Sequence, residues 1–107
     1  MMMIKRTETD IQREICLYLK CKGYFFWREG NQRRVTKSGV HCKAKFEVNG
    51  KPDIFVIDGA ITWGIEVKTP KGKVSESQKE FRKQWEIEPV RIYRVVRSVE
   101  DVMDIGL

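Results

Sequence analysis

The residues with the clearest potential for chemistry are two acids and a lysine, separated by a fixed length of chain. Asp53 follows a proline, and after twelve intervening residues come Glu66, a valine and Lys68. Successive side chains of a strand point to opposite faces, so we expect Glu66 and Lys68 on one face. A turn at Asp58-Gly59 folds the preceding strand back alongside and can bring Asp53 near both residues.

The chemistry that such a cluster favours is metal-dependent. Neighbouring carboxylates repel each other unless a cation lies between them, and oxygen ligands suit Mg²⁺ or Mn²⁺. Such a cation polarises a phosphate oxygen and acidifies water, and Lys68 would orient that water or stabilise charge on the phosphate. The pattern therefore predicts hydrolysis of a phosphodiester bond. The alternative is structural, with Asp53 as a turn residue and Glu66 and Lys68 as a solvent-facing pair.

Two residues on predicted helices can join this cluster. Glu8 shares a helix face with Ile15 and Leu19, whereas Glu14 lies on a different face. If the apolar face packs on the sheet, Glu8 reaches its edge as a further metal ligand; the alternative is an acid that complements the helix dipole. Gln78 is expected to point toward the site, or to serve only in a capping box with the serine three residues before it.

Basic residues dominate the chain and favour a polyanionic partner. The net charge is +6, the isoelectric point is near 9.4, and residues 28–51 alone carry seven basic and two acidic side chains. We expect these basic residues to contact DNA, together with Lys71 and Lys73, the alternative being a solvated loop. The basic residues of the segment are Arg28, Arg33, Arg34, Lys37, Lys43, Lys45 and Lys51.

The size and composition of the chain favour one folded domain over residues 1–107. Hydrophobic residues make up 41% and charged residues 34%, which excludes a disordered chain. No apolar stretch approaches the roughly 18 residues of a membrane span and no signal peptide is apparent, so we expect a cytoplasmic protein without a membrane partner. The odd number of cysteines, Cys16, Cys21 and Cys42, favours reduced thiols.

The periodicity predicts an α/β fold in the order helix, three strands, helix, strand, helix. Thr7 or Thr9 caps a first helix that ends at Gly23, and a short strand then leads into a loop or hairpin through Ser38-Gly39. Later elements are strands over 53–57, 61–69 and 90–96, and helices that begin after Ser75 and Ser98. We expect a mixed sheet flanked by helices. Trp27, Trp63 and Trp85 are assigned to the core rather than to base-stacking surfaces.

The order and spacing of several short motifs resemble a known family. The pattern Pro-Asp, twelve residues, Glu-x-Lys resembles the PD-(D/E)xK nuclease superfamily, and the surrounding sequence resembles its VRR-NUC branch, the virus-type replication and repair nucleases. The motifs that carry the resemblance are Glu8-x-x-x-Gln12, Gly50-Lys51-Pro52-Asp53, residues 65–72 (IEVKTPKG), Ser75-x-x-Gln78, and residues 95–101 (VVRSVED).

The resemblance implies a restriction-endonuclease-like core and cleavage of DNA with Mg²⁺ or Mn²⁺. It makes Asp53, Glu66 and the carbonyl of Val67 metal ligands and Lys68 the catalytic lysine, with Glu8 and Gln78 supporting the site. It further implies a stand-alone phage or prophage nuclease, working in the cytoplasm of a bacterial or phage-infected cell. By analogy, such a protein acts as a homodimer on branched DNA such as Holliday junctions.

Two other functions remain open from the residues. One is a nucleic-acid-binding module that keeps the acidic cluster only as support for the fold. The other is a nuclease that acts on RNA or on unbranched DNA. Phosphate contacts carry no sugar or sequence code, so the basic residues do not separate DNA from RNA.

Overall fold

Four strands form a mixed sheet at the centre of the computed structural model, which describes residues 6–29, 34–35, 41–42 and 48–107, with the backbone alone for 34–35 and 41–42. In spatial order the strands are β1 (Phe25–Arg28), β4 (Ile54–Asp58), β5 (Ile61–Val67) and β6 (Arg91–Val96). β4 runs antiparallel to both β1 and β5, whereas β6 runs parallel to β5. The predicted mixed α/β sheet is thus confirmed.

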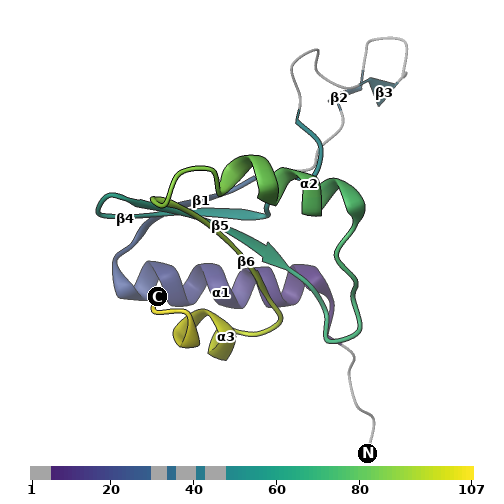
Figure 1. Ribbon diagram of the computed structural model, residues 1–107. Helices are drawn as coiled ribbons and strands as arrows, with labels where there is room; N and C mark the ends of the chain where they lie inside the picture. The colour runs from purple at the N-terminus through teal and green to yellow at the C-terminus, as the bar shows by residue number, and fades with distance from the viewer. Residues whose placement is uncertain (1–5, 30–33, 36–40, 43–47) are drawn as a thin grey trace, which may run out of the picture.

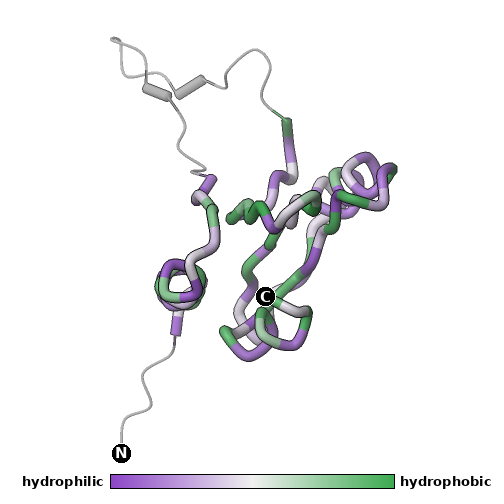
Figure 2. The backbone as a smooth tube through the Cα atoms, turned by 90° about the vertical axis from the view of Figure 1, so that its left-hand side faces the viewer, coloured by the Kyte–Doolittle hydropathy of each residue, from purple (hydrophilic) through white to green (hydrophobic). Residues whose placement is uncertain are grey.

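Helices cover both faces of this sheet. In Figures 1 and 2, α1 (Glu8–Lys22) and α3 (Val99–Asp104) lie side by side on one face, and α2 (Glu76–Trp85) lies on the other. Helix α2 connects β5 to β6, the crossover that two parallel strands require. No helix within the described ranges is long and apolar enough to cross a membrane.

The first helix begins and ends where its local sequence predicts. The hydroxyl of Thr7, not Thr9, accepts from the backbone N–H of Asp10, whose carboxylate accepts from the N–H of Thr7 in return. At the other end Gly23 adopts the left-handed conformation with φ 83°, which glycine reaches at little cost. The capped helix presents a buried apolar stripe of Ile11, Ile15 and Leu19 to the sheet.

The β4–β5 hairpin supplies most of the sheet's buried side chains. Asp58 pairs with Ile61, which leaves a two-residue turn in which Gly59 has φ 61°. From this turn the side chains alternate between the two faces. Those that meet α1 and α3 form the core, including Ile54, Val56, Trp63, Ile65 and Val67.

The predicted hairpin in the basic segment is present in the described backbone. Strand β2 (Arg34–Val35) pairs antiparallel with β3 (His41–Cys42) and forms a separate two-stranded sheet. The predicted turn at Ser38-Gly39 lies outside the described residues.

Candidate active site

Asp53 and Glu66 lie opposite each other because of the register of the β4–β5 hairpin. Ile54 pairs with Ile65, and continuing this register by one residue places Asp53 opposite Glu66. The backbone N–H of Asp53 donates to the carbonyl of Ile65 at 3.0 Å. The N–H of Val67 donates to Asp53 Oδ2 at 2.8 Å, which holds this carboxylate against β5. The proximity predicted from the spacing of the two acids is therefore present.

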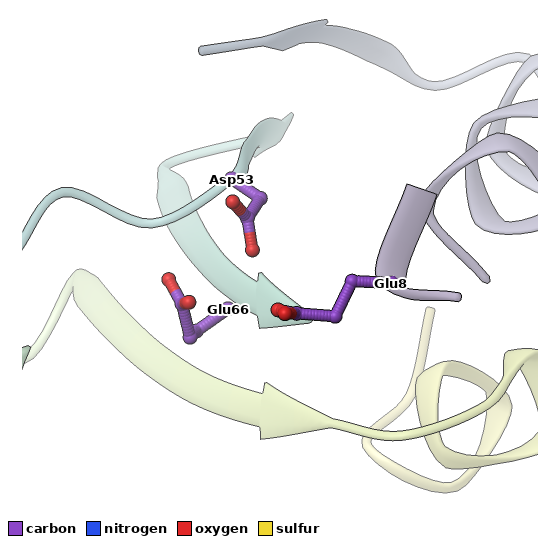
Figure 3. A group of neighbouring side chains, drawn as sticks. All are labelled: Glu8, Asp53 and Glu66. Atoms are coloured by element: carbon purple, nitrogen blue, oxygen red, sulfur yellow. The ribbon is translucent and has the colours of Figure 1, made fainter. Parts of the chain in front are cut away.

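A third carboxylate reaches the same place from α1. Glu8 lies in the first turn of the helix, and Figure 3 shows its side chain extending toward Asp53 and Glu66. One carboxylate oxygen from each residue lies within 4.8 Å of those of the other two. Glu8 is exposed to solvent, whereas Asp53 is 8% and Glu66 3% exposed. Glu8 thus reaches the edge of the sheet beside the other two acids, as its predicted role of a metal ligand requires.

Burial and mutual repulsion disfavour the ionised carboxylates in the acidic cluster. Burial, followed by the charge of Asp53, raises the pKa of Glu66 from 4.5 to about 8, against the opposing charge of Lys68. Burial also raises the pKa of Asp53, although the hydrogen bond from Val67 opposes that shift. The cluster therefore favours either a bound proton or a bound cation.

A divalent cation fits the atoms that are present. All the candidate ligand atoms are carboxylate oxygens, which hard cations prefer. Within the described residues, Glu66 Oε2 is buried and has no hydrogen-bond donor. A buried acceptor without a partner is costly, and coordination of a cation would satisfy it. The geometry thus agrees with a divalent metal site.

Gln78 fulfils both of the roles that the sequence left as alternatives. Its side-chain Oε1 accepts from the backbone N–H of Ser75 at 2.9 Å and completes a capping box at the start of α2. Its Nε2 donates to Glu66 Oε1 at 2.7 Å. The amide therefore connects the beginning of α2 to the acidic cluster and orients the Glu66 carboxylate.

Lys68 shares the face of Glu66, as strand alternation predicts. Its Nζ lies 3.6 Å from Glu66 Oε1, and its side chain is largely buried. The turn that follows packs on its alkyl chain: a Cβ added to Gly72 would lie 3.4 Å from both Cβ and Cδ of Lys68. The ammonium is held next to the carboxylates instead of extending into solvent.

The basic residues predicted to contact DNA occupy different surroundings. Arg28 is exposed and donates to Gln12 Oε1 at 3.0 Å. Lys51 is partly buried, and Lys71 and Lys73 are exposed. The other predicted DNA contacts fall on Arg33, Lys37, Lys43 and Lys45, which lie outside the described residues, and on Arg34, whose backbone alone is described. Their contact with nucleic acid stays a prediction, as does the role of the Val67 carbonyl.

Three residues that support the site were not identified from the sequence. Tyr93 is fully buried; burial and the charges of Glu66 and Asp53 raise the pKa of its phenol. Gly50 has φ 80°, and a Cβ there would lie 2.2 Å from the Ser77 carbonyl oxygen.

Arg97 is the third of these residues. Its Nη1 donates to the carbonyls of Thr69 at 2.6 Å and Gly72 at 2.8 Å, which fixes the turn after Lys68. Gly50 and Arg97 both belong to motifs quoted from the sequence, but neither motif indicates which residues they contact, because these contacts join residues far apart in the sequence.

The assignment of all three tryptophans to the core is wrong for one of them. Trp63 is buried in the core and Trp85 is partly buried. Trp27 is 41% exposed, because β1 is an edge strand and no described helix covers it fully.

Comparison with known proteins finds similarity in structure. No protein-family model and no curated protein matches the chain. A solved structure described as a "VRR_NUC domain" superimposes with a TM-score of 0.63 at 17% sequence identity, covering 94% of this chain and 95% of that one. Because the identity is low, the likeness concerns the fold. The chain thus has the fold of a VRR_NUC domain, as its sequence motifs predicted.

Proposed function

We propose that the chain is a nuclease of the VRR-NUC type, which hydrolyses phosphodiester bonds of DNA with a divalent cation. The observation that carries this proposal is the convergence of Glu8, Asp53 and Glu66 within 4.8 Å, with the ammonium of Lys68 3.6 Å from Glu66. Three carboxylates and a lysine in this arrangement offer both a cation site and a positive charge for a phosphate. The shared fold with a VRR_NUC domain supports the same assignment.

In this proposal Glu8, Asp53 and Glu66 would hold the cation, and the Val67 carbonyl would be a further ligand. The oxygen ligands and the partial exposure at Glu8 favour Mg²⁺ or Mn²⁺, which retain several waters in protein sites. A cation at this position supplies Lewis-acid polarisation of a phosphate oxygen and lowers the pKa of water.

The protein's own groups position the reaction. We assign to the Lys68 ammonium, which lies 3.6 Å from Glu66 Oε1, donation to the attacking water or to a phosphate oxygen, where it would stabilise the negative charge that develops. Gln78 holds the Glu66 carboxylate by its 2.7 Å hydrogen bond, and Val67 holds that of Asp53. These fixed contacts reduce the reorganisation that the site would otherwise need during the reaction.

The substrate and assembly extend the proposal by analogy with the family. The basic composition supports a polyanionic substrate. We assign DNA contacts to the seven basic residues of segment 28–51, which include Arg28 and Lys51, and to Lys71 and Lys73. One site cuts one strand, so symmetric branched DNA such as a Holliday junction would require a homodimer. Replication, repair and recombination are the processes in which such a substrate arises.

The test is cleavage of labelled four-way junction, flap, duplex and single-stranded DNA, and of an RNA duplex, with Mg²⁺, Mn²⁺ or EDTA. We expect cleavage of DNA with a metal and none in EDTA. Lys68→Ala should slow cleavage on the order of 10²- to 10³-fold, the cost of losing one stabilising group in the transition state, with folding and DNA binding retained.

Lys79→Ala is the matched control, because Lys79 is exposed on α2 and pairs with Glu76 instead of the acidic cluster. Tight DNA binding without cleavage by any metal would instead support a non-catalytic binding module. Preferential cleavage of RNA would change the substrate class.

A further inference from the structure

Two aromatic side chains form an exposed surface at the edge of the sheet. Phe25 and Trp27 lie two residues apart on β1, so they share one face of the strand. Phe25 is 71% and Trp27 41% exposed, and their ring centroids are 6.2 Å apart in an edge-on arrangement. β1 is the outer strand of the four-stranded sheet (Figure 1), so within that sheet only β4 flanks these two residues.

Trp27, one of the two residues of this aromatic surface, packs against aromatic residues of neighbouring elements. Trp27 pairs in register with Phe55 of β4, and their rings stack with centroids 5.3 Å apart at 25°. Phe55 in turn contacts Trp85 of α2 at 5.4 Å. The face that carries Phe25 and Trp27 is therefore the face covered further along by α2, and the exposed rings extend a buried aromatic row.

The same surface is adjacent to the acidic cluster. Phe55 lies two residues after Asp53, and the N–H of Glu29 donates to the Asp53 carbonyl at 2.8 Å, which extends the β1–β4 register to the site. A two-residue step along a strand covers roughly 7 Å, and neighbouring strands are about 5 Å apart. Trp27 thus lies roughly 9 Å and Phe25 roughly 15 Å from Asp53 along the sheet, distances that a few nucleotides of an unpaired strand can span.

We infer that Phe25 and Trp27 form a stacking surface for an unpaired base of the substrate strand, within a few nucleotides of the bond that is cut. The inference rests on the proposed nuclease function and narrows its substrate to DNA with an unpaired region. An exposed aromatic ring stacks on a base only when that base has a free face, which bases inside a duplex lack.

The exposed area fits a base better than a protein partner. Aromatic side chains bury 150–250 Å² each, so the exposed fractions of Phe25 and Trp27 offer roughly 250 Å². A standard protein interface requires about 800 Å² from each partner, whereas one base needs far less. The net charge of +6 also favours a polyanion over a second basic copy of this chain.

The test is equilibrium binding of flap DNA in EDTA, with a single abasic position moved through the unpaired nucleotides next to the branch. In the wild type, one abasic position should weaken binding on the order of 5- to 150-fold, which corresponds to the stacking free energy of one base on an aromatic side chain. In Phe25→Leu/Trp27→Leu the intact and abasic DNAs should bind equally, because leucine keeps the apolar side chain but not the aromatic face.

Three further variants keep the test interpretable. Trp27→Phe should restore part of the sensitivity to the abasic position. Leu17→Ala, at an exposed apolar residue on α1, should behave as the wild type. Should Trp27→Leu unfold, Phe25→Leu alone still tests the inference, because the exposed Phe25 ring contributes little to the core.

The inference is wrong if the abasic position has the same effect in the wild type and in the double leucine variant, or has no effect at any position. It is also wrong if the leucine variant changes only the monomer–dimer equilibrium, which would assign this face to a second copy. Because binding is measured in EDTA, a protein that binds but never cuts would fail the nuclease proposal without failing this test. Cleavage of DNA by a protein whose binding is insensitive to every abasic position would instead fail this inference without failing the nuclease proposal.

Discussion

Glu66 has a buried carboxylate whose partners define the site. Gln78 donates to its Oε1, and the ammonium of Lys68 lies 3.6 Å from the same oxygen. Its Oε2 has no donor in the described part of the chain, and Asp53 lies opposite. A carboxylate in such surroundings is stable as a neutral acid or beside a cation, which connects metal binding to pH.

The metal-free protein should lose stability as the pH rises. Burial and Asp53 raise the folded-state pKa of Glu66 to about 8, above its ordinary 4.5, so the folded state binds more protons than the unfolded state between these values. The stabilisation that this proton provides is complete below about pH 4.5 and is lost as the pH rises to about 8. The check is the free energy of unfolding in urea with EDTA, at intervals from pH 5 to 9.

Glu66→Gln is the control for this pH dependence, because glutamine cannot ionise and retains the shape of the side chain. We expect a flatter profile in the variant, and a metal that stabilises the wild type more at pH 8 than at pH 5. Parallel profiles for the two proteins in EDTA would show that Glu66 does not carry the effect.

Glu8 should contribute to metal affinity although it is exposed. Its carboxylate belongs to the cluster, whereas Glu14 on another face of α1 pairs with Arg6. Glu8→Gln should weaken Mn²⁺ binding about 10-fold, the lower end of the range for groups that support a metal site, and Glu14→Gln should leave it unchanged. Isothermal titration of both variants measures this; equal affinities would remove Glu8 from the site.

At the residue scale the sequence predicted the reactive groups better than their surroundings. Asp53, Glu66 and Lys68 follow from strand alternation and a turn, which are local rules. The exposure of Trp27 was not predictable, because an aromatic run such as residues 24–28 is equally compatible with an edge strand and with a central strand. Tyr93 and Arg97 were missed because their contacts join distant segments.

Helix α2 is fixed on the sheet by a close approach of backbone to backbone. Gly50 lies against the Ser77–Gln78 peptide with φ 80°, so a side chain would require both an unfavourable backbone conformation and a displacement of the helix. The displaced peptide carries Gln78, which orients Glu66. The loop before β4 thus positions the start of α2 over the acidic cluster.

Gly50→Ala should destabilise the fold and slow cleavage together. The left-handed conformation costs a non-glycine residue about 1–2 kcal/mol and the overlap about 1–3 kcal/mol more, so a loss of roughly 2–5 kcal/mol is expected. Gly23→Ala is the matched control, since Gly23 has φ 83° with nothing within 4 Å of an added Cβ. It should cost about 1–2 kcal/mol and leave cleavage unchanged.

The two variants are compared by urea unfolding and by the cleavage rate, which is measured at a temperature where both are folded. If the two substitutions prove equally mild and neither changes the rate, Gly50 does not position α2.

The boundaries of the helices were predictable because capping residues mark them. The order of the strands in the sheet was not predictable. Thr7, Gly23, Ser75 and Ser98 are local signals, and each helix begins or ends at them in the structure. The position of β1 beside β4 depends on pairing between residues about thirty positions apart in the chain. No turn residue determines this pairing, so the position of β1 at the edge of the sheet could not be predicted from local signals.

At the scale of the whole molecule, a chain of positive net charge contains a cluster of three acidic residues. The net charge of +6 attracts a polyanion, yet Glu8, Asp53 and Glu66 would repel a phosphate brought close to them. A divalent cation held by these carboxylates would resolve this conflict, because it would offset their charge and polarise a phosphate oxygen. Metal binding and cleavage should therefore depend on the same residues.

The most direct test is single-turnover cleavage of a labelled branched DNA over a Mn²⁺ titration, by the wild type, Asp53→Asn and Glu14→Gln. We expect no cleavage in EDTA, saturable activation of the wild type and of Glu14→Gln, and a loss of at least about 100-fold in Asp53→Asn, since even groups outside the ligand set cost 10- to 100-fold. Cleavage that persists in EDTA, or an Asp53→Asn variant as active as the wild type, would contradict the proposed metal-dependent hydrolysis.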